Sequence, residues 1–188
     1  MERRERKLNR LRNWDYSSDG YYFVTFNVKH WLPVFGQVLH DKMVLNEWGK
    51  IAEECWRLIP KYNKYCFVDE FVIMPNHVHG IIRIVKENGA KNSRAAFLRP
   101  VHNAGAMVGA AEMRPSSTVN RSKMLLSHAV HSFKSAVTAN ICKLSESDFQ
   151  WQRSFYDHII RDEEELFRVR EYIINNPLMW SIDHGKYD

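Results

Sequence analysis

The chain has 188 residues, of which 45% are hydrophobic and 13% aromatic, and this composition suits a single globular domain with a sizeable core. Its net charge of +5 and its pI near 9.1 favour an anionic partner. No apolar run reaches membrane-spanning length, the N-terminus lacks the apolar stretch of a signal peptide, and the three cysteines form no pairing motif. These features predict a cytoplasmic protein with reduced thiols and no membrane partner.

Residues 1–13 form a basic arm in which Arg3, Arg4 and Arg6 are candidate DNA-binding residues. Arginines in such an arm can follow a phosphate backbone. A solvated terminus that binds nothing explains the same charges equally well.

A strand and a helix are predicted next. Residues 21–29 are rich in aromatic and β-branched side chains and follow Gly20, which predicts a strand. Residues 45–60 predict a helix that Asn46 caps and Pro60 stops.

Two histidines open the second strand of a predicted hairpin. Residues 67–74 and 78–85 form two apolar runs joined by a proline–asparagine turn. Side chains at i and i+2 of an extended chain point to the same face, so His77 and His79 can meet one metal ion or one phosphate. The alternative is a pair of hydrogen-bonded histidines at a strand end, with no ligand.

The middle of the chain contains an insertion and an amphipathic helix. Residues 87–124 have many small and polar side chains and no clear period, which predicts a mobile insertion within the single domain. Basic residues outnumber acidic ones there, so the insertion could order on DNA. Residues 127–144 predict a helix, on which Lys134 could contact phosphate or simply be solvated.

The C-terminal part predicts a strand over residues 155–161 and then a helix that Asp162 caps and Pro177 ends. Tyr172 and Asn176 lie four residues apart and therefore share a helix face. A tyrosine there could be a nucleophile, and an amide oxygen one turn later could complete a metal shell. Alternatively, Tyr172 is a core residue and Asn176 caps the helix.

These motifs together resemble a known family. Residues 74–80 (MPNHVHG), with the tyrosine at 172 and the run NNPL at 175–178, resemble the IS200-like transposases. These are the single-tyrosine (Y1) members of the HUH nuclease group, and the resemblance is nearest to the branch of REP-associated tyrosine transposases. Further matching segments are spread over the chain, at residues 14–17, 22–26, 45–49 and 151–158.

The predicted element order is β-α-β-β-α-β-α, a split β-α-β plan. The resemblance implies the same α+β class: a ferredoxin-like sandwich whose antiparallel sheet carries helices on one face and a C-terminal helix with the tyrosine. It also implies an enzyme that cleaves and rejoins single-stranded or hairpin DNA through a 5′-phosphotyrosine. In that scheme Tyr172 is the nucleophile, and His77, His79 and Asn176 hold Mg²⁺ or Mn²⁺. Members of the family act as homodimers or, in the REP-associated branch, as monomers.

Two other functions are compatible with the same residues. One is a non-catalytic, domesticated DNA-binding protein that keeps the fold for recognition. The other is a metal-dependent phosphodiesterase for RNA or small nucleotides, in which Tyr172 is only structural.

Overall fold

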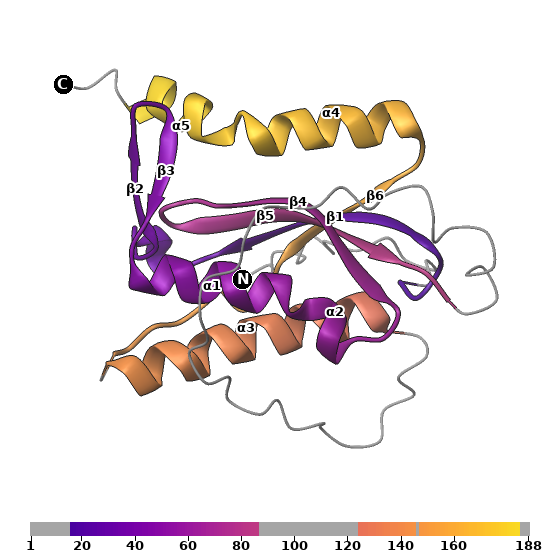
Figure 1. Cartoon of the computed structure of the whole chain (residues 1–188), viewed down its shortest axis with the longest axis horizontal. Coiled ribbons are helices and arrows are strands. Elements are labelled where there is room, and N and C mark those ends of the chain that lie inside the picture. The colour runs from indigo at the N-terminus through magenta and orange to yellow at the C-terminus, as the bar shows by residue number, and fades with distance from the viewer. Residues whose placement is uncertain (1–15, 87–123, 146, 185–188) are drawn as a thin grey trace, which may run out of the picture.

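The computed structural model describes residues 16–86, 124–145 and 147–184. Helices cover both faces of one antiparallel sheet in this part of the chain (Figure 1). The predictions for the arm with Arg3, Arg4 and Arg6, and for all but the last residue of the insertion, lie outside the described residues.

The main sheet has four strands in the order β4-β5-β1-β6, and every neighbouring pair is antiparallel. These strands are β1 (Gly20–Asn27), β4 (Cys66–Ile73), β5 (His77–Ile84) and β6 (Tyr156–Ile160). Helix α1 (Glu47–Arg57) lies between β1 and β4 in sequence, and α3 (Leu125–Leu144) lies between β5 and β6. This β-α-β-β-α-β order with these neighbours is a ferredoxin-like sandwich, as predicted.

One face of the sheet packs against α1 and α3 and forms the larger core. Alternate residues of β1, such as Val24 and Phe26, are fully buried on this face. The indole of Trp56 on α1 packs directly against Gly80 of β5, where an added Cβ would lie 2.3 Å from a ring carbon. The glycine after the two histidines therefore makes room for a core tryptophan on the opposite face of the sheet.

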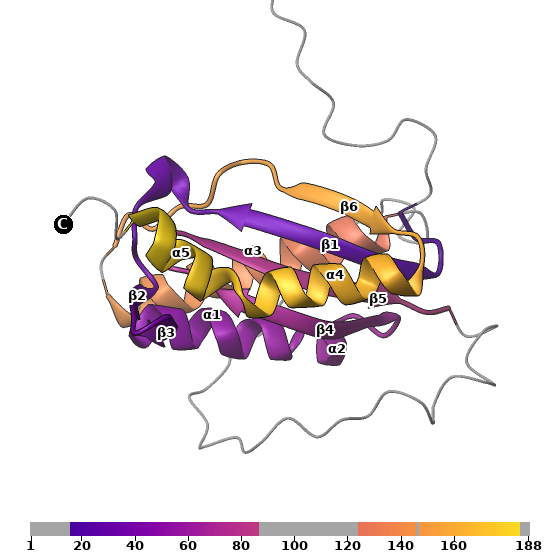
Figure 2. The ribbon, with the colours of Figure 1, turned by 90° about the horizontal axis from the view of Figure 1, so that it is seen from above.

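The other face is covered by α4 (Glu163–Ile174), which lies along the sheet (Figure 2). A smaller apolar cluster joins them, with Ile81 from β5 and Ile173 from α4 at its centre. Arg170 of α4 donates two hydrogen bonds to the Asp69 carboxylate of β4, at 2.7 and 2.6 Å. The tyrosine-bearing helix is therefore fixed to the sheet by both apolar and ionic contacts.

Several local features differ from the predictions. The predicted helix over 45–60 begins at Glu47, with Asn46 as its cap, and ends at Arg57. Pro60 does not stop it but lies in the first turn of the short helix α2 (Ile59–Tyr62), and Pro177 likewise lies in the first turn of α5 (Asn176–His184). The fixed φ of proline suits the first turn of a helix, so both prolines start helices rather than end them.

A hairpin was not predicted. Strands β2 (Gly36–Leu39) and β3 (Lys42–Leu45) pair with each other outside the main sheet, after the short 3-10 helix η1 (Lys29–Trp31). The hairpin contacts α5 and stands beside it (Figure 1). No helix within the described residues is long and apolar enough to cross a bilayer.

Candidate active site

His77 and His79 are the first and third residues of β5 and point to the face that α4 covers. Their ring centroids lie 4.6 Å apart. Burial lowers the pKa of His77 to about 4, although a hydrogen bond with the Asn176 side chain opposes this shift. Burial and the nearby His77 ring lower the pKa of His79 to about 3. Both rings are therefore neutral at pH 7, the form in which imidazole binds metal ions.

Asn76 fixes the tautomer of His77. Its amide nitrogen donates to the backbone carbonyl of Trp31 at 3.1 Å, and its amide oxygen lies 2.7 Å from Nδ1 of His77. Because the amide nitrogen must face a carbonyl, the oxygen faces the ring, and Nδ1 must carry the proton that the oxygen accepts. The lone pair of His77 is therefore on Nε2.

His79 is oriented by β1. Thr25 lies directly opposite it in the strand register, and the Thr25 hydroxyl lies 2.8 Å from Nδ1 of His79. The ring of Phe23 stacks on the His79 ring at a centroid distance of 5.4 Å. These contacts turn Nε2 of His79 toward Tyr172.

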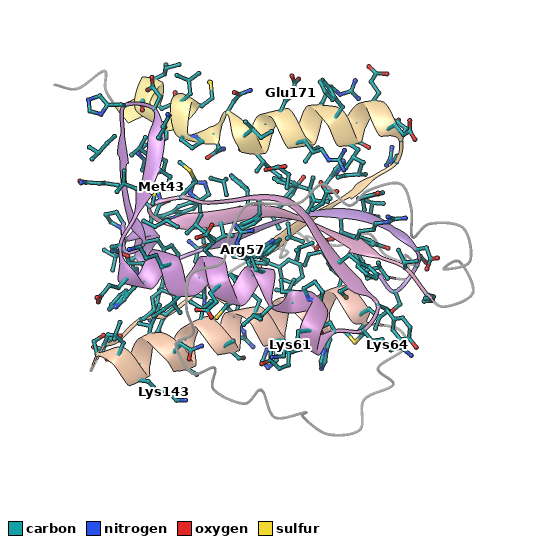
Figure 3. All side chains as sticks on the ribbon, in the orientation of Figure 1. Met43, Arg57, Lys61, Lys64, Lys143 and Glu171 are labelled. Atoms are coloured by element: carbon teal, nitrogen blue, oxygen red, sulfur yellow. The ribbon has the colours of Figure 1, made fainter. Side chains whose placement is uncertain are left out.

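The hydroxyl oxygen of Tyr172 lies 3.4 Å from Nε2 of His79 in the same chain. The side chain is 49% exposed, so the alternative of a core tyrosine is wrong. Its ring meets Phe23 edge-on at 6.0 Å, which holds the phenol over the sheet. The neighbouring Glu171 points away from the sheet on the outer side of α4 (Figure 3).

Asn176 is 7% exposed and hydrogen-bonds His77 through its side chain. The residue that caps α4 is Asn175, so the alternative of Asn176 as the cap is also wrong. The end of α4 and the start of α5 therefore place the Asn176 amide beside His77 and the Tyr172 phenol beside His79. One turn further on, the centroid of a Trp180 ring lies 5.9 Å from that of the His77 ring.

The groups that meet here are two neutral imidazole rings and one side-chain amide, whose oxygen can serve as a metal ligand. No cluster of three His, Cys, Asp or Glu side chains able to hold a metal occurs in the described part of the chain. The polar groups beside the two imidazoles are the Asn176 amide and the Tyr172 phenol. Such a set suits a divalent ion of intermediate softness such as Mn²⁺ and accepts the harder Mg²⁺ less readily. The chemistry of the residues present therefore fits a divalent cation.

Two other basic side chains have defined partners. The ammonium of Lys134 donates to the carbonyl of Gln152 at 2.6 Å, and burial lowers its pKa to about 8. The prediction that Lys134 contacts phosphate stays a prediction, but the side chain is not simply solvated. His158 on β6 is another titratable side chain near α4, but its ring lies 2.7 Å from the carboxylate of Glu165. Because Glu165 lies about two helical turns before Tyr172 on α4, His158 is too far along the helix to act as a base for the Tyr172 phenol.

Sequence reasoning missed Thr25, Asn76 and Trp180 as partners of the histidines. Asn76 carried a usable signal, because it directly precedes His77 in the turn. Thr25 and Trp180 had no such signal in the sequence. Strand register places Thr25 beside His79, and the angle between α4 and α5 places Trp180 beside His77.

The fold is that of the IS200-like single-tyrosine transposases. A REP-associated tyrosine transposase, solved in complex with a REP hairpin, superposes on 90% of this chain and 73% of its own, with a TM-score of 0.52 and 15% identity. At that identity the likeness establishes the fold.

The sequence is 36% identical to an uncharacterized protein of Haemophilus influenzae over 178 residues, which are 95% of this chain and 91% of the relative. The chain belongs to the same family as that protein. No protein-family model matches the sequence.

Proposed function

We propose that this protein is a metal-dependent transposase that cleaves and rejoins single-stranded DNA through a 5′-phosphotyrosine. One observation carries the proposal: an exposed phenol, Tyr172, lies 3.4 Å from a buried neutral histidine, His79, of the same chain. This contact places the candidate nucleophile beside the two histidines, where attack on a phosphate held there would need it.

His77, His79 and Asn176 would hold a divalent cation, Mn²⁺ or Mg²⁺. When bound, the cation neutralises the phosphate charge and orients the phosphorus for in-line attack. Asn76 and Thr25 supply the fixed ring orientations that such ligands require.

Tyr172 provides the covalent step. Its phenol loses a proton, the oxygen bonds to phosphorus, and the bond from phosphorus to the 3′ oxygen breaks to leave a free 3′-OH. The new phosphotyrosine is a diester, so a later 3′-OH can attack it and rejoin strands without further energy input.

DNA is the proposed partner. The net charge of +5 favours a polyanion, and the structurally similar transposase is bound to a REP hairpin. We therefore propose single-stranded or hairpin DNA as substrate. Because Tyr172 faces the histidines of its own chain, a monomer holds the complete set of groups, and a homodimer is not needed to assemble it.

The test is a covalent-adduct assay. Labelled hairpin oligonucleotides with randomised single-stranded flanks are incubated with the protein and Mn²⁺ and then denatured. We expect a protein–DNA adduct that is lost in Tyr172→Phe and persists in Tyr156→Phe, because Tyr156 is equally exposed, at 51%, but touches neither histidine in the described contacts.

The other outcomes select the rival functions. Tight binding with no adduct across the pool favours a non-catalytic DNA-binding protein. Cleavage that survives Tyr172→Phe favours a phosphodiesterase, and an adduct that moves to Tyr156 removes Tyr172 from the mechanism.

A further inference from the structure

An open cavity of about 570 Å³ lies between residues 29–31 and 150–153, and we call it the loop pocket. These two segments are joined where β1 ends: the backbone N–H of Lys29 donates to the Gln150 carbonyl at 2.9 Å, and that of Gln152 donates to the Asn27 carbonyl at 2.8 Å. Asn27 lies opposite His77 in the strand register. The loop pocket therefore borders the candidate active site.

The lining of the loop pocket combines a large aromatic surface with cations. Trp31 is 55% exposed, and the exposed side chains of Lys29 and Arg153 line the same cavity. Within the described residues no carboxylate pairs with either cation, and the ammonium of Lys29 donates only to the Gln150 amide oxygen, at 2.7 Å. An exposed tryptophan beside two available positive charges is complementary to an aromatic anion.

The segment that presents Trp31 is held in an uncommon conformation. His30 and Trp31 have φ angles of 60° and 58°, in the left-handed region that bulky residues rarely adopt. Two hydrogen bonds hold the turn, one from the Trp31 N–H to the Val28 carbonyl and one from Asn76 to the Trp31 carbonyl, both 3.1 Å. The same Asn76 amide orients His77, so the position of Trp31 is tied to that of a candidate metal ligand.

The opposite wall is fixed to α3. The indole N–H of Trp151 donates to the Lys134 carbonyl at 3.2 Å, and the Lys134 ammonium donates to the Gln152 carbonyl at 2.6 Å. The wall is thus held in place from α3, and a ligand meets a site that is already formed. Such preorganisation reduces the entropy lost on binding.

We infer that the loop pocket binds one unpaired nucleotide of the DNA strand, next to the phosphodiester that Tyr172 attacks. The base stacks on Trp31, while Lys29 and Arg153 contact the adjacent phosphates. This inference rests on the proposed function, because it takes single-stranded DNA as the substrate. A base within a duplex is already stacked and paired, so the pocket distinguishes single strands from duplexes.

The test measures binding in the Tyr172→Phe protein, so that no cleavage occurs. The probe is a fluorescein-labelled 20-nucleotide single strand of mixed sequence, with its duplex as the comparison, read by fluorescence anisotropy. We expect Trp31→Ala to weaken single-strand binding about tenfold, Trp31→Phe to restore most of it, and duplex binding to stay unchanged.

Matched controls lie at the other end of the sheet. Phe67→Ala removes an aromatic ring that is 48% exposed at the start of β4, and Lys64→Gln removes a nearby charge (Figure 3). We expect neither to affect the affinity more than twofold. Lys29→Gln should lower the slope of log affinity against log salt by about 0.7, the value for one phosphate contact on a single strand.

The inference is overturned if Trp31→Ala binds the single strand as tightly as its parent, or if Phe67→Ala weakens binding equally. Its failure is distinguishable from failure of the proposed function. An adduct at Tyr172 with no effect of Trp31→Ala removes only the nucleotide pocket. A Trp31-dependent preference for single strands with no adduct at any sequence removes only the strand-transfer chemistry.

Discussion

The two faces of the sheet use the same strands for different purposes. On β1, Val24 and Phe26 point into the large core, while Thr25 between them points to the other face and contacts His79. On β5, His77 and His79 flank Val78, which is fully buried in that core. Because successive side chains of a strand point to opposite faces of the sheet, core residues alternate along the strand with residues of the candidate site. Substitutions on the two faces should therefore affect different measurements.

The largest expected effect on stability is on the core face. Trp56→Ala removes a fully buried indole and leaves a cavity beneath Gly80, so we expect the free energy of unfolding to fall by about 3–5 kcal/mol. Trp31→Ala, at an exposed tryptophan, should change it by less than about 0.5 kcal/mol. Urea denaturation of both variants measures the contrast, and similar losses would contradict the assignment of the core.

On the site face, the largest expected effect is on cleavage. His77→Ala should reduce adduct formation to below detection and leave DNA binding largely intact, because binding depends on distributed phosphate contacts. Removal of divalent ions by EDTA should have the same effect, reversed by Mn²⁺. His131→Ala, at an exposed histidine on α3, serves as control. Parallel loss of binding and cleavage in His77→Ala would count against a metal role.

A smaller effect, on metal affinity, is expected for Asn76, which contacts the proposed ligand His77. Asn76→Ala removes the acceptor that fixes the His77 tautomer, so Mn²⁺ affinity should fall about 10- to 100-fold. Titration calorimetry measures this, with Asn140→Ala on the opposite face as control. Unchanged affinity in Asn76→Ala would show that the ring needs no such support.

The smallest effect concerns the ion pair that fixes α4 to the sheet. Burial raises the pKa of the Asp69 carboxyl, but hydrogen bonds from Arg170 and the Glu70 N–H, with the charge of Arg170, lower it below its ordinary value. Asp69→Asn should therefore cost about 1–2 kcal/mol of unfolding free energy near neutral pH.

The stability lost in Asp69→Asn should depend on pH in a defined direction. The pKa of the Asp69 carboxyl is lower in the folded protein than in the unfolded chain. Such a carboxyl stabilises the fold at pH values above its pKa in the unfolded chain, and this stabilisation is lost as the pH falls through its pKa in the folded protein. The difference between the parent and Asp69→Asn should thus be constant above about pH 5 and shrink in acid. A difference that grows on acidification would contradict the role of this pair.

Local sequence patterns predicted much of the site. The spacing of His77 and His79 on an extended chain fixed their common face, and Asp162 caps α4 as expected, accepting from the Glu165 N–H at 2.7 Å. The resemblance to a known family supplied the ferredoxin-like fold and the grouping of Tyr172 with the histidines. Their roles remain proposals.

Other features depend on contacts distant in sequence or on unusual turns. The β2–β3 hairpin turns at His40 and Asp41, both with positive φ, where an Asn-Gly pair would have signalled the turn. The loop pocket joins segments more than a hundred residues apart, which no local pattern reveals. Pro60 and Pro177 showed that a proline alone does not distinguish the end of one helix from the start of the next.

Anomalous scattering from crystals of the full chain soaked in manganese would locate the bound ion and so test the proposed metal site. We expect one strong peak coordinated by His77, His79 and the Asn176 side chain, with the Tyr172 hydroxyl beside it. A peak elsewhere, or none at the histidines at millimolar Mn²⁺, would contradict it.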